Sequence, residues 1–168
     1  RAIFSEADHS LGTLQMLTVD GPTTYYEDGR GSNGLEYLLS KAFADSLGVE
    51  LVVQSKPTLH ALLLSVGGPE GNFAAANITV NESRSKTLHF TDPYMQVTQH
   101  LVYRRGSARP RSLGDIDGDL LVLKSSSHSD QLKHWTEQYP ELQWREDSSS
   151  EMSELLRMVH DREIDYTV

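Results

Sequence analysis

The stretch Gly34–Val53, GLEYLLSKAFADSLGVELVV, contains the pattern that decides the fold. Its apolar residues recur at the spacing of one helix face: Leu35, Leu38, Leu39, Ala42, Phe43 and Leu47. Gly48 suits the C-cap of that helix, and Glu50–Gln54 (ELVVQ) has the composition of a strand. The stretch therefore predicts a helix that ends at a glycine and leads directly into a strand.

The flanking segments repeat this alternation. Thr13–Val19 (TLQMLTV) is a strong strand, which Asp20-Gly21-Pro22 ends, and Pro22–Asn33 is predicted to be a loop. After the central stretch, leucines at 59, 62 and 63 predict a short helix, and the apolar run Phe73–Ile78 predicts a buried strand. Strand, helix, strand, helix, strand is the order of a parallel α/β sheet.

A second set of elements follows an arginine-rich segment. Arg104–Arg111 combines four arginines with Gly106 and Pro110 and is predicted to be a hinge. Beyond it we expect strands at Leu120–Lys124, Leu142–Arg145 and Asp165–Val168, and helices at Asp130–Tyr139 and Glu151–Val159. The sequence thus predicts a first lobe over 1–103, a hinge over 104–111 and a second lobe over 112–168, with a cleft between the lobes.

Composition excludes several function classes. The chain has 168 residues, with 24 acidic and 15 basic residues and a formal charge of −9, which argues against a nucleic-acid binder and against an anionic membrane surface as partner. It has no cysteine, so thiolate metal sites, disulfides and a cysteine nucleophile are ruled out. No apolar run is long enough to span a membrane. Because the chain starts at Arg1 without an apolar leader, we expect a processed form or a piece of a longer protein.

Two enzyme motifs occur but lack their structural context. Gly29, Gly31 and Gly34 spell G-x-G-x-x-G, the fingerprint of nucleotide-dependent oxidoreductases, yet Pro22 and a long segment separate them from the preceding strand. Glu82-Ser83 is the pair found in lysozyme-like enzymes, but no helical cleft surrounds it that would keep the acid protonated. The sequence therefore favours a binding module over an enzyme.

We expect no cofactor and no metal ion. The seven histidines do not pair at i,i+4 with an acid between them, and His128 and His134 fall on different faces of one predicted helix.

Two polar segments that follow predicted strands are candidates for ligand binding. In Ala74–Tyr94, AAANITVNESRSKTLHFTDPY, Thr79 follows a buried strand and Arg84 comes shortly after it, where a guanidinium can form a two-pronged bond to a carboxylate. Ser125-Ser126-Ser127-His128 lies between a strand and a helix and offers hydroxyl and N–H groups to a polar ligand. The alternatives are an exposed arginine on a turn and simple N-capping by Ser127 or Ser129.

The first of these segments resembles the solute-binding proteins of family 3, the periplasmic amino-acid receptors. Its matching residues are Asn77, Thr79, Arg84, Phe90, Asp92, Pro93 and Tyr94, and Gly34–Val53 matches as well. The resemblance implies an α/β, periplasmic-binding-protein-like fold of two lobes, each with a mostly parallel sheet flanked by helices. It also implies that the C-terminal return to the first lobe is missing from this chain.

A more specific resemblance is to the receptor-like module of the membrane-bound lytic murein transglycosylase F subfamily. It rests on PTTYY (Pro22–Tyr26), QHLVYRRG (Gln99–Gly106), RPRSL (Arg109–Leu113), VLKSSSHSDQL (Val122–Leu132) and YPELQW (Tyr139–Trp144). In that subfamily the module precedes a lysozyme-like domain that cleaves peptidoglycan. The resemblance implies export to the periplasm and a parent protein tethered to the outer membrane.

The resemblance also assigns roles to individual residues. Arg84 would hold a ligand carboxylate beside Thr79 and Asn77, and Tyr25 and Tyr26 would line the cleft. From the second lobe, the facing residues would be Ser126, Ser127 and His128. The expected function is to bind an amino acid, peptide or muropeptide and to regulate an attached transglycosylase. The alternative is a free-standing receptor that delivers an amino acid to an ABC uptake transporter.

Overall fold

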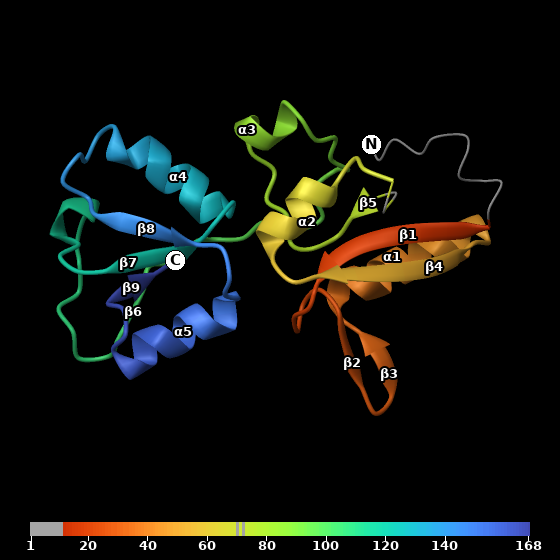
Figure 1. The fold of residues 1–168 in the computed structure, drawn as a ribbon, viewed down its shortest axis with the longest axis horizontal. Coiled ribbons are helices and arrows are strands. Elements are labelled where there is room, and N and C mark those ends of the chain that lie inside the picture. Colours follow the sequence, from red (N-terminus) through yellow and green to blue (C-terminus); the bar gives the residue numbers. More distant parts are fainter. Residues whose placement is uncertain (1–11, 70, 72) are drawn as a thin grey trace. The chain divides into compact units, whose positions relative to one another are not determined.

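The computed structural model describes residues 12–69, 71 and 73–168. The chain forms two compact units, which divide between Met95 and Gln96 (Figure 1). Unit 1 ends at Met95, and unit 2 comprises Gln96–Val168.

Unit 1 is built on a parallel sheet in the order β4-β1-β5, from β1 (Thr13–Val19), β4 (Glu50–Lys56) and β5 (Phe73–Ala74). The predicted strands are therefore present, but the third is shorter than Phe73–Ile78. Ala75 still donates its N–H to the Leu17 carbonyl at 2.9 Å, after which Asn77 adopts a left-handed backbone with φ of 52°. That conformation turns the chain out of the sheet.

Among the described residues, the helices that accompany this sheet are α1 (Leu35–Leu47), α2 (Leu59–Ser65) and the single turn α3 (Glu82–Ser85). Helix α1 lies behind β1 and β4 in the view of Figure 1, and α2 packs through Leu62 against Leu17. The Thr58 hydroxyl caps α2, and Gly48 ends α1 in the left-handed conformation, as its position predicted.

The segment predicted to be a loop at 22–33 contains a hairpin of β2 (Tyr26–Asp28) and β3 (Gly31–Asn33), so that prediction was wrong. The Asp28 carboxylate accepts the Arg30 N–H at 2.8 Å, and Gly31 has φ of 118°, which closes the tight turn. Two glycines of the G-x-G-x-x-G motif, Gly29 and Gly31, therefore belong to a hairpin and not to a phosphate-binding loop.

Unit 2 is a four-stranded sheet in the order β6-β9-β7-β8. Its strands are β6 (Val102–Tyr103), β7 (Leu120–Leu123), β8 (Trp144–Asp147) and β9 (Tyr166–Thr167), and only β6 runs antiparallel. Helices α4 (Ser127–Thr136) and α5 (Met152–Asp161) cover opposite faces of the sheet (Figure 1). The 3-10 turn η2 (Leu113–Asp115) precedes β7.

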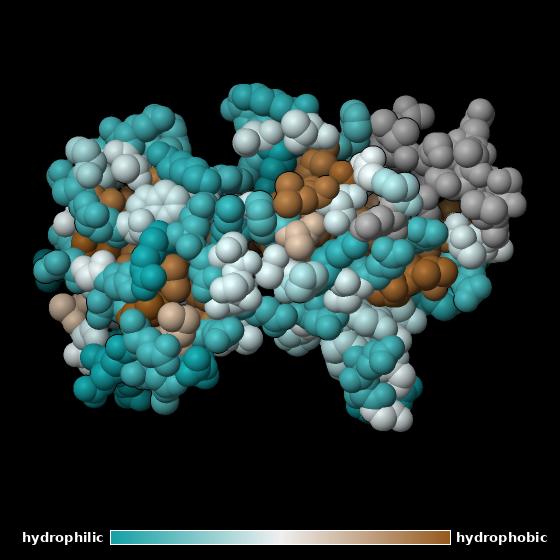
Figure 2. Space-filling model, in the orientation of Figure 1, coloured by the Kyte–Doolittle hydropathy of each residue, from teal (hydrophilic) through white to brown (hydrophobic). Residues whose placement is uncertain are grey.

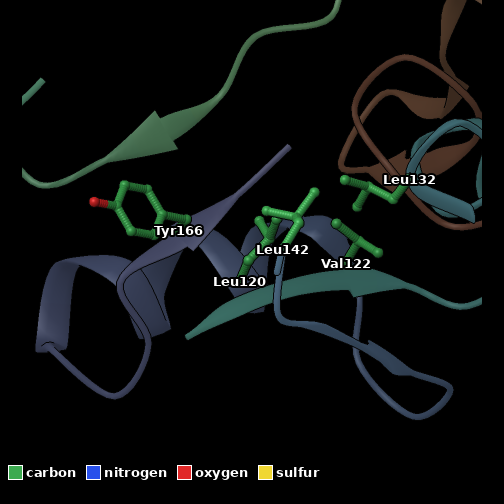
Figure 3. Packing of buried hydrophobic residues seen from close by; sticks show 5 residues of the cluster. All are labelled: Leu120, Val122, Leu132, Leu142 and Tyr166. Carbon is green, nitrogen blue, oxygen red and sulfur yellow. The ribbon is translucent and has the colours of Figure 1, made fainter. Parts of the chain in front are cut away.

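Alternating residues of β7 build a core on each face of this sheet. Leu120 and Val122 pack with Leu132 of α4 and with Leu142 and Tyr166 (Figure 3). Leu121 packs on the other face with α5, against Leu155, Val159 and Ile164. Because strand side chains alternate between faces, one short apolar strand supplies both cores.

The unit boundary lies earlier in the chain than the hinge expected at 104–111. Val102 and Tyr103 pair with Thr167 and Tyr166 in the second sheet, so β6 belongs to unit 2 although it precedes the arginine-rich segment. Arg104–Arg111 consequently lies inside unit 2, and the role of that segment as a hinge stays a prediction.

Candidate functional site

Polar groups of unit 1 meet where β1 and β5 end. Thr23 lies in the loop after β1, and its hydroxyl accepts a hydrogen bond from the side-chain amide of Asn77 at 2.8 Å. The carbonyls of Thr23 and Thr24 accept the N–H groups of Glu36 and Tyr37, both at 3.1 Å. The loops after two adjacent parallel strands are thus joined to each other and to the start of α1, at the edge where open α/β sheets bind ligands.

Glu36 is the centre of this network. It lies in the first turn of α1 and is 6% exposed. Its Oε1 accepts the backbone N–H of Asn77 at 2.7 Å and the Tyr94 hydroxyl at 2.8 Å. Burial and the bond to this carboxylate raise the pKa of Tyr94 to about 12, because both disfavour the phenolate. One carboxylate therefore connects α1, the turn after β5 and the end of unit 1.

The turn after β5 also positions Arg84. The Asn81 side chain caps α3 by accepting the Arg84 N–H at 2.8 Å, and Arg84 Nη1 donates to the Thr79 carbonyl at 3.0 Å. Arg84 is 8% exposed, so its guanidinium is held within the protein and does not extend into solvent. The structure brings Thr79 and Arg84 together, and their role in ligand binding stays a prediction.

The two candidate tyrosines occupy different surroundings. The Tyr25 hydroxyl donates to Glu27 at 2.7 Å, and its ring lies 5.5 Å from the ring of Tyr37 on α1 in a tilted arrangement. Tyr26, in β2, is 40% exposed. Tyr25 therefore fastens the hairpin to α1, while Tyr26 stays at the surface.

In unit 2 the serine-rich segment forms the start of α4. Ser125 has a left-handed backbone with φ of 59°, and Ser126, 5% exposed, caps the helix by accepting the Ser129 N–H at 3.1 Å. The N-cap is therefore Ser126 and not Ser127 or Ser129. Ser127 accepts a hydrogen bond from the Gln99 side chain at 3.0 Å, and the neighbouring His128 is partly buried.

Neither a metal centre nor a membrane span is found in the part of the chain that the structure describes. Across residues 12–69, 71 and 73–168, no three His, Cys, Asp or Glu side chains form a group that could hold a metal ion. Over the same residues, no helix has the length and apolar character needed to cross a bilayer.

Sequence reasoning named Asn77 and Tyr94 but missed Glu36, the carboxylate to which both are bonded. A glutamate in the first turn of a helix is common, because it interacts favourably with the helix dipole. Its signal was its place inside an apolar pattern, between Leu35 and Leu38, where a carboxylate needs buried hydrogen-bond donors.

Solved structures with the same fold include amino-acid receptors. The arginine-bound form of a truncated arginine-binding protein from T. maritima superposes with a TM-score of 0.82 at 22% identity, covering 97% of this chain and 76% of that one. The ancestral amino acid-binding protein AncCDT-1, a precursor of cyclohexadienyl dehydratase, gives a TM-score of 0.82 at 21% identity, with 96% and 71% covered. The α/β periplasmic-binding-protein-like fold is thereby confirmed.

Curated relatives confirm the more specific resemblance. The membrane-bound lytic murein transglycosylase F of Saccharophagus degradans is 43% identical over 160 residues, which are 95% of this chain and 32% of the relative. The corresponding protein of Pseudomonas fluorescens is 41% identical over 159 residues, 94% of this chain and 33% of the relative. The chain thus spans about a third of these relatives.

The family model that matches this chain describes the bacterial extracellular solute-binding proteins, family 3, and it covers residues 14–165. That range includes the Glu36 network, the turn that carries Arg84 and most of both sheets, and it ends just before β9. The chain belongs to the bacterial extracellular solute-binding proteins, family 3.

Proposed function

We propose that this chain is a sensor module that binds an amino acid, a peptide or a muropeptide fragment. In the parent protein it is attached to a domain that cleaves peptidoglycan as a lytic transglycosylase, in the periplasm and tethered to the outer membrane. The observation that best supports the proposal is the hydrogen bond between Thr79 and the buried Arg84 just beyond β5. The chain that contains this pair is about 40% identical to part of transglycosylase F relatives.

Arg84 is the residue that we assign to the ligand carboxylate. A guanidinium has five donors, so a bond to the Thr79 carbonyl is compatible with a two-pronged bond to a carboxylate. The turn that carries both residues is anchored by Asn77, whose N–H and amide bind Glu36 and Thr23. The site in unit 1 is therefore organised before a ligand arrives, which lowers the cost of binding.

The roles of the other candidates are part of the same proposal. Thr79 and Asn77 offer polar contacts beside Arg84, and Tyr25 and Tyr26 present aromatic surface on the hairpin. Ser126, Ser127 and His128 provide a separate set of polar groups in unit 2.

A thermal-shift screen with common amino acids, stem peptides and muropeptides tests the proposal. A ligand that binds the native state raises the melting temperature by mass action. Arg84→Ala should weaken binding of the best ligand by about 2–5 kcal/mol, because it leaves the ligand carboxylate without its charged partner. Lys86→Ala, on an exposed residue of the same turn, is the control and should leave affinity unchanged.

Two outcomes would contradict the proposal at different levels. If no compound in the screen shifts the melting temperature, the chain is not a sensor for these ligands. If a ligand binds but Arg84→Ala keeps full affinity, the function stands and the site assignment is wrong. A gene in which a stop codon follows the receptor module would instead support the free-standing amino-acid receptor.

We further propose that this segment alone does not cleave peptidoglycan. The Glu82 side chain is 92% exposed and forms an ion pair with Lys86 at 3.7 Å, so it lies at the surface and not in a cleft that excludes water, as glycoside cleavage needs. Incubation of the purified chain with sacculi should release no anhydro-muropeptides, and their release would refute this part of the proposal.

A further inference from the structure

The arginine-rich segment Arg104–Arg111, RRGSARPR, has no role in the site described above. It lies in unit 2 between β6 and η2, where Arg105, Arg109 and Arg111 are exposed and Arg104 is partly buried. Its remaining residues are glycine, serine, alanine and proline. In a chain of formal charge −9, this is a local concentration of positive charge on a segment without large apolar side chains.

These arginines differ from most other surface cations in their partners. In the described part of the chain, an ion pair with a carboxylate is formed by each of Arg30, Lys41, Lys86, Lys133, Arg145 and Arg157, although not by Lys124 or Arg162. For the four arginines of 104–111, no carboxylate lies within ion-pair distance among the residues that the structure describes. Their charge is therefore available to a partner outside the chain.

The backbone gives this segment a defined shape. Ser107 donates its N–H to the Arg104 carbonyl at 3.1 Å, and Gly106 has φ of 93°, so a tight turn separates the first two arginines from the last two. At the far end, the Asp115 carboxylate accepts the backbone N–H groups of Arg111 and Ser112 at 2.9 and 3.0 Å. The Asp115 carboxylate thus holds the backbone of the loop and forms no ion pair with its arginine side chains.

The chemistry of the loop favours a partner that is anionic and narrow, such as a polymer strand. Guanidinium groups bind carboxylates and phosphates in two-pronged geometry, and an open hollow is lined by Ala108, Arg109, Pro110 and Arg111. A chain with a formal charge of −9 is repelled by an extended anionic bilayer. A thin polymer strand can contact the loop alone.

We propose that Arg104–Arg111 is a docking loop for the carboxylate-bearing stem peptides of polymeric peptidoglycan, separate from the ligand site at Arg84. The choice of peptidoglycan rests on the proposed function, since the module would be attached to an enzyme that works on this polymer. The loop would hold the module on its polymer, while the Arg84 site would sample soluble fragments.

Co-sedimentation of the whole chain with purified sacculi tests this inference. The triple variant Arg105→Glu, Arg109→Glu, Arg111→Glu should bind sacculi at least about tenfold more weakly in dilute salt, because attraction becomes repulsion. The triple variant Arg30→Glu, Lys41→Glu, Lys86→Glu changes net charge by the same amount at paired surface sites and should lose less than about twofold. Binding of the unaltered chain should fall as salt is added.

Additional measurements distinguish failure of this inference from failure of the proposed function, and peptidoglycan from other anionic partners. Arg84→Ala should keep full retention on sacculi even where it abolishes binding of small ligands. Replacement of the three exposed loop arginines by lysine should give intermediate retention, because lysine keeps the positive charge but cannot form the two-pronged bond of a guanidinium. Equal loss in both charge-reversal variants, or binding of the chain to phosphatidylglycerol vesicles in preference to sacculi, would overturn the inference. Circular dichroism confirms that each variant is folded.

Discussion

Helix α1 of unit 1 and helix α5 of unit 2 use their apolar residues in opposite ways. Helix α5 buries Leu155 and Val159, 0% and 4% exposed, in a core shared with β7. Helix α1 instead buries a stripe of polar and small residues, Glu36, Ser40 and Ala44, and leaves its large apolar side chains 39–53% exposed: Leu35, Leu38, Leu39, Phe43 and Leu47. A helical apolar pattern therefore does not by itself show which stripe faces the sheet.

The reason lies in how closely α1 approaches its neighbours. A Cβ added at Gly34, the residue before α1, would lie 2.3 Å from the Thr24 carbonyl oxygen, so only glycine fits there. Ser40 and Ala44 continue the close approach with short side chains, and Glu36 binds Asn77 and Tyr94. Hydrogen bonds at the carboxyl edge of the sheet thus position α1, whereas packing on both faces of a sheet holds unit 2 together.

The largest expected effect comes from the core of unit 2. Leu155→Ala should lower the free energy of unfolding by about 2–5 kcal/mol, because it leaves a cavity in a fully buried site. Its neighbour Leu156 is 43% exposed, so Leu156→Ala should cost less than about 1 kcal/mol. Urea denaturation followed by tryptophan fluorescence measures both. Similar losses in the two variants would break the contrast between packed and exposed stripes.

The next effect concerns the polar anchor of α1. Glu36→Gln keeps the size of the side chain but removes the charge that strengthens its bonds from Asn77 and Tyr94, so we expect a loss of about 1–3 kcal/mol. The pKa of Tyr94 should fall from about 12, because the anion that disfavours its phenolate is gone. Phenolate absorbance during alkaline titration measures this change.

Tyr94→Phe is the control for that titration, since the difference between the two spectra belongs to Tyr94 alone. The Glu36 interpretation predicts that Glu36→Gln destabilises the Tyr94→Phe background less than the unaltered chain, because the two residues share one bond. Additive losses, with an unchanged Tyr94 pKa, would show that the carboxylate does not connect these elements.

Much of this fold could be predicted from periodicity and glycine placement. The apolar runs at β1, β4 and β7 and the glycine at position 48 locate the elements correctly, because burial and backbone geometry leave a local signal. The hairpin of β2 and β3 was missed, since its strands are short and polar and its turn depends on Asp28 and Gly31. The pairing of β6 with β9 joins Val102 to Thr167, a separation that no local pattern encodes.

The candidate site divides in the same way. Arg84 and Thr79 could be found because they follow a buried strand and match a family pattern, and their mutual bond confirms that they lie together. The Glu36 network depends on contacts between residues far apart in the sequence, such as Tyr94, and on the left-handed backbone of Asn77. Such contacts arise only in the folded chain, and no fixed spacing in the sequence reveals them.

Asp147, a carboxylate of unit 2, extends the comparison with Glu36 to the pH dependence of stability. Asp147 accepts bonds from the N–H and hydroxyl groups of Ser149 and Ser150 ahead of α5. These bonds lower the pKa of Asp147 to about 2, below its ordinary value of 3.8. The ionised form therefore stabilises the fold above about pH 4, and this contribution is lost as pH falls towards 2.

Asp147→Asn should accordingly reduce the loss of folding stability as the pH falls into the acid range. Between pH 5 and pH 2.5 the unaltered chain should lose about 1 kcal/mol more than the variant, after allowance for solvent screening of a partly exposed group. Urea denaturation at several pH values gives both curves. Parallel curves would mean that the serines ahead of α5 do not favour the ionised carboxylate.

The smallest expected effect on stability lies on the apolar stripe of α1. Leu39→Gln and Phe43→Gln should each change the free energy of unfolding by less than about 1 kcal/mol, because these positions are 46% and 39% exposed and glutamine is a good helix former. On the opposite side of the same helix, Ala44→Gln should cost more than about 2 kcal/mol, since it forces a polar side chain into a fully buried position. Denaturation at two protein concentrations measures all three. If Leu39→Gln costs as much as Leu155→Ala, and the cost grows with protein concentration, a second copy covers the stripe in solution, and the contrast between α1 and α5 fails.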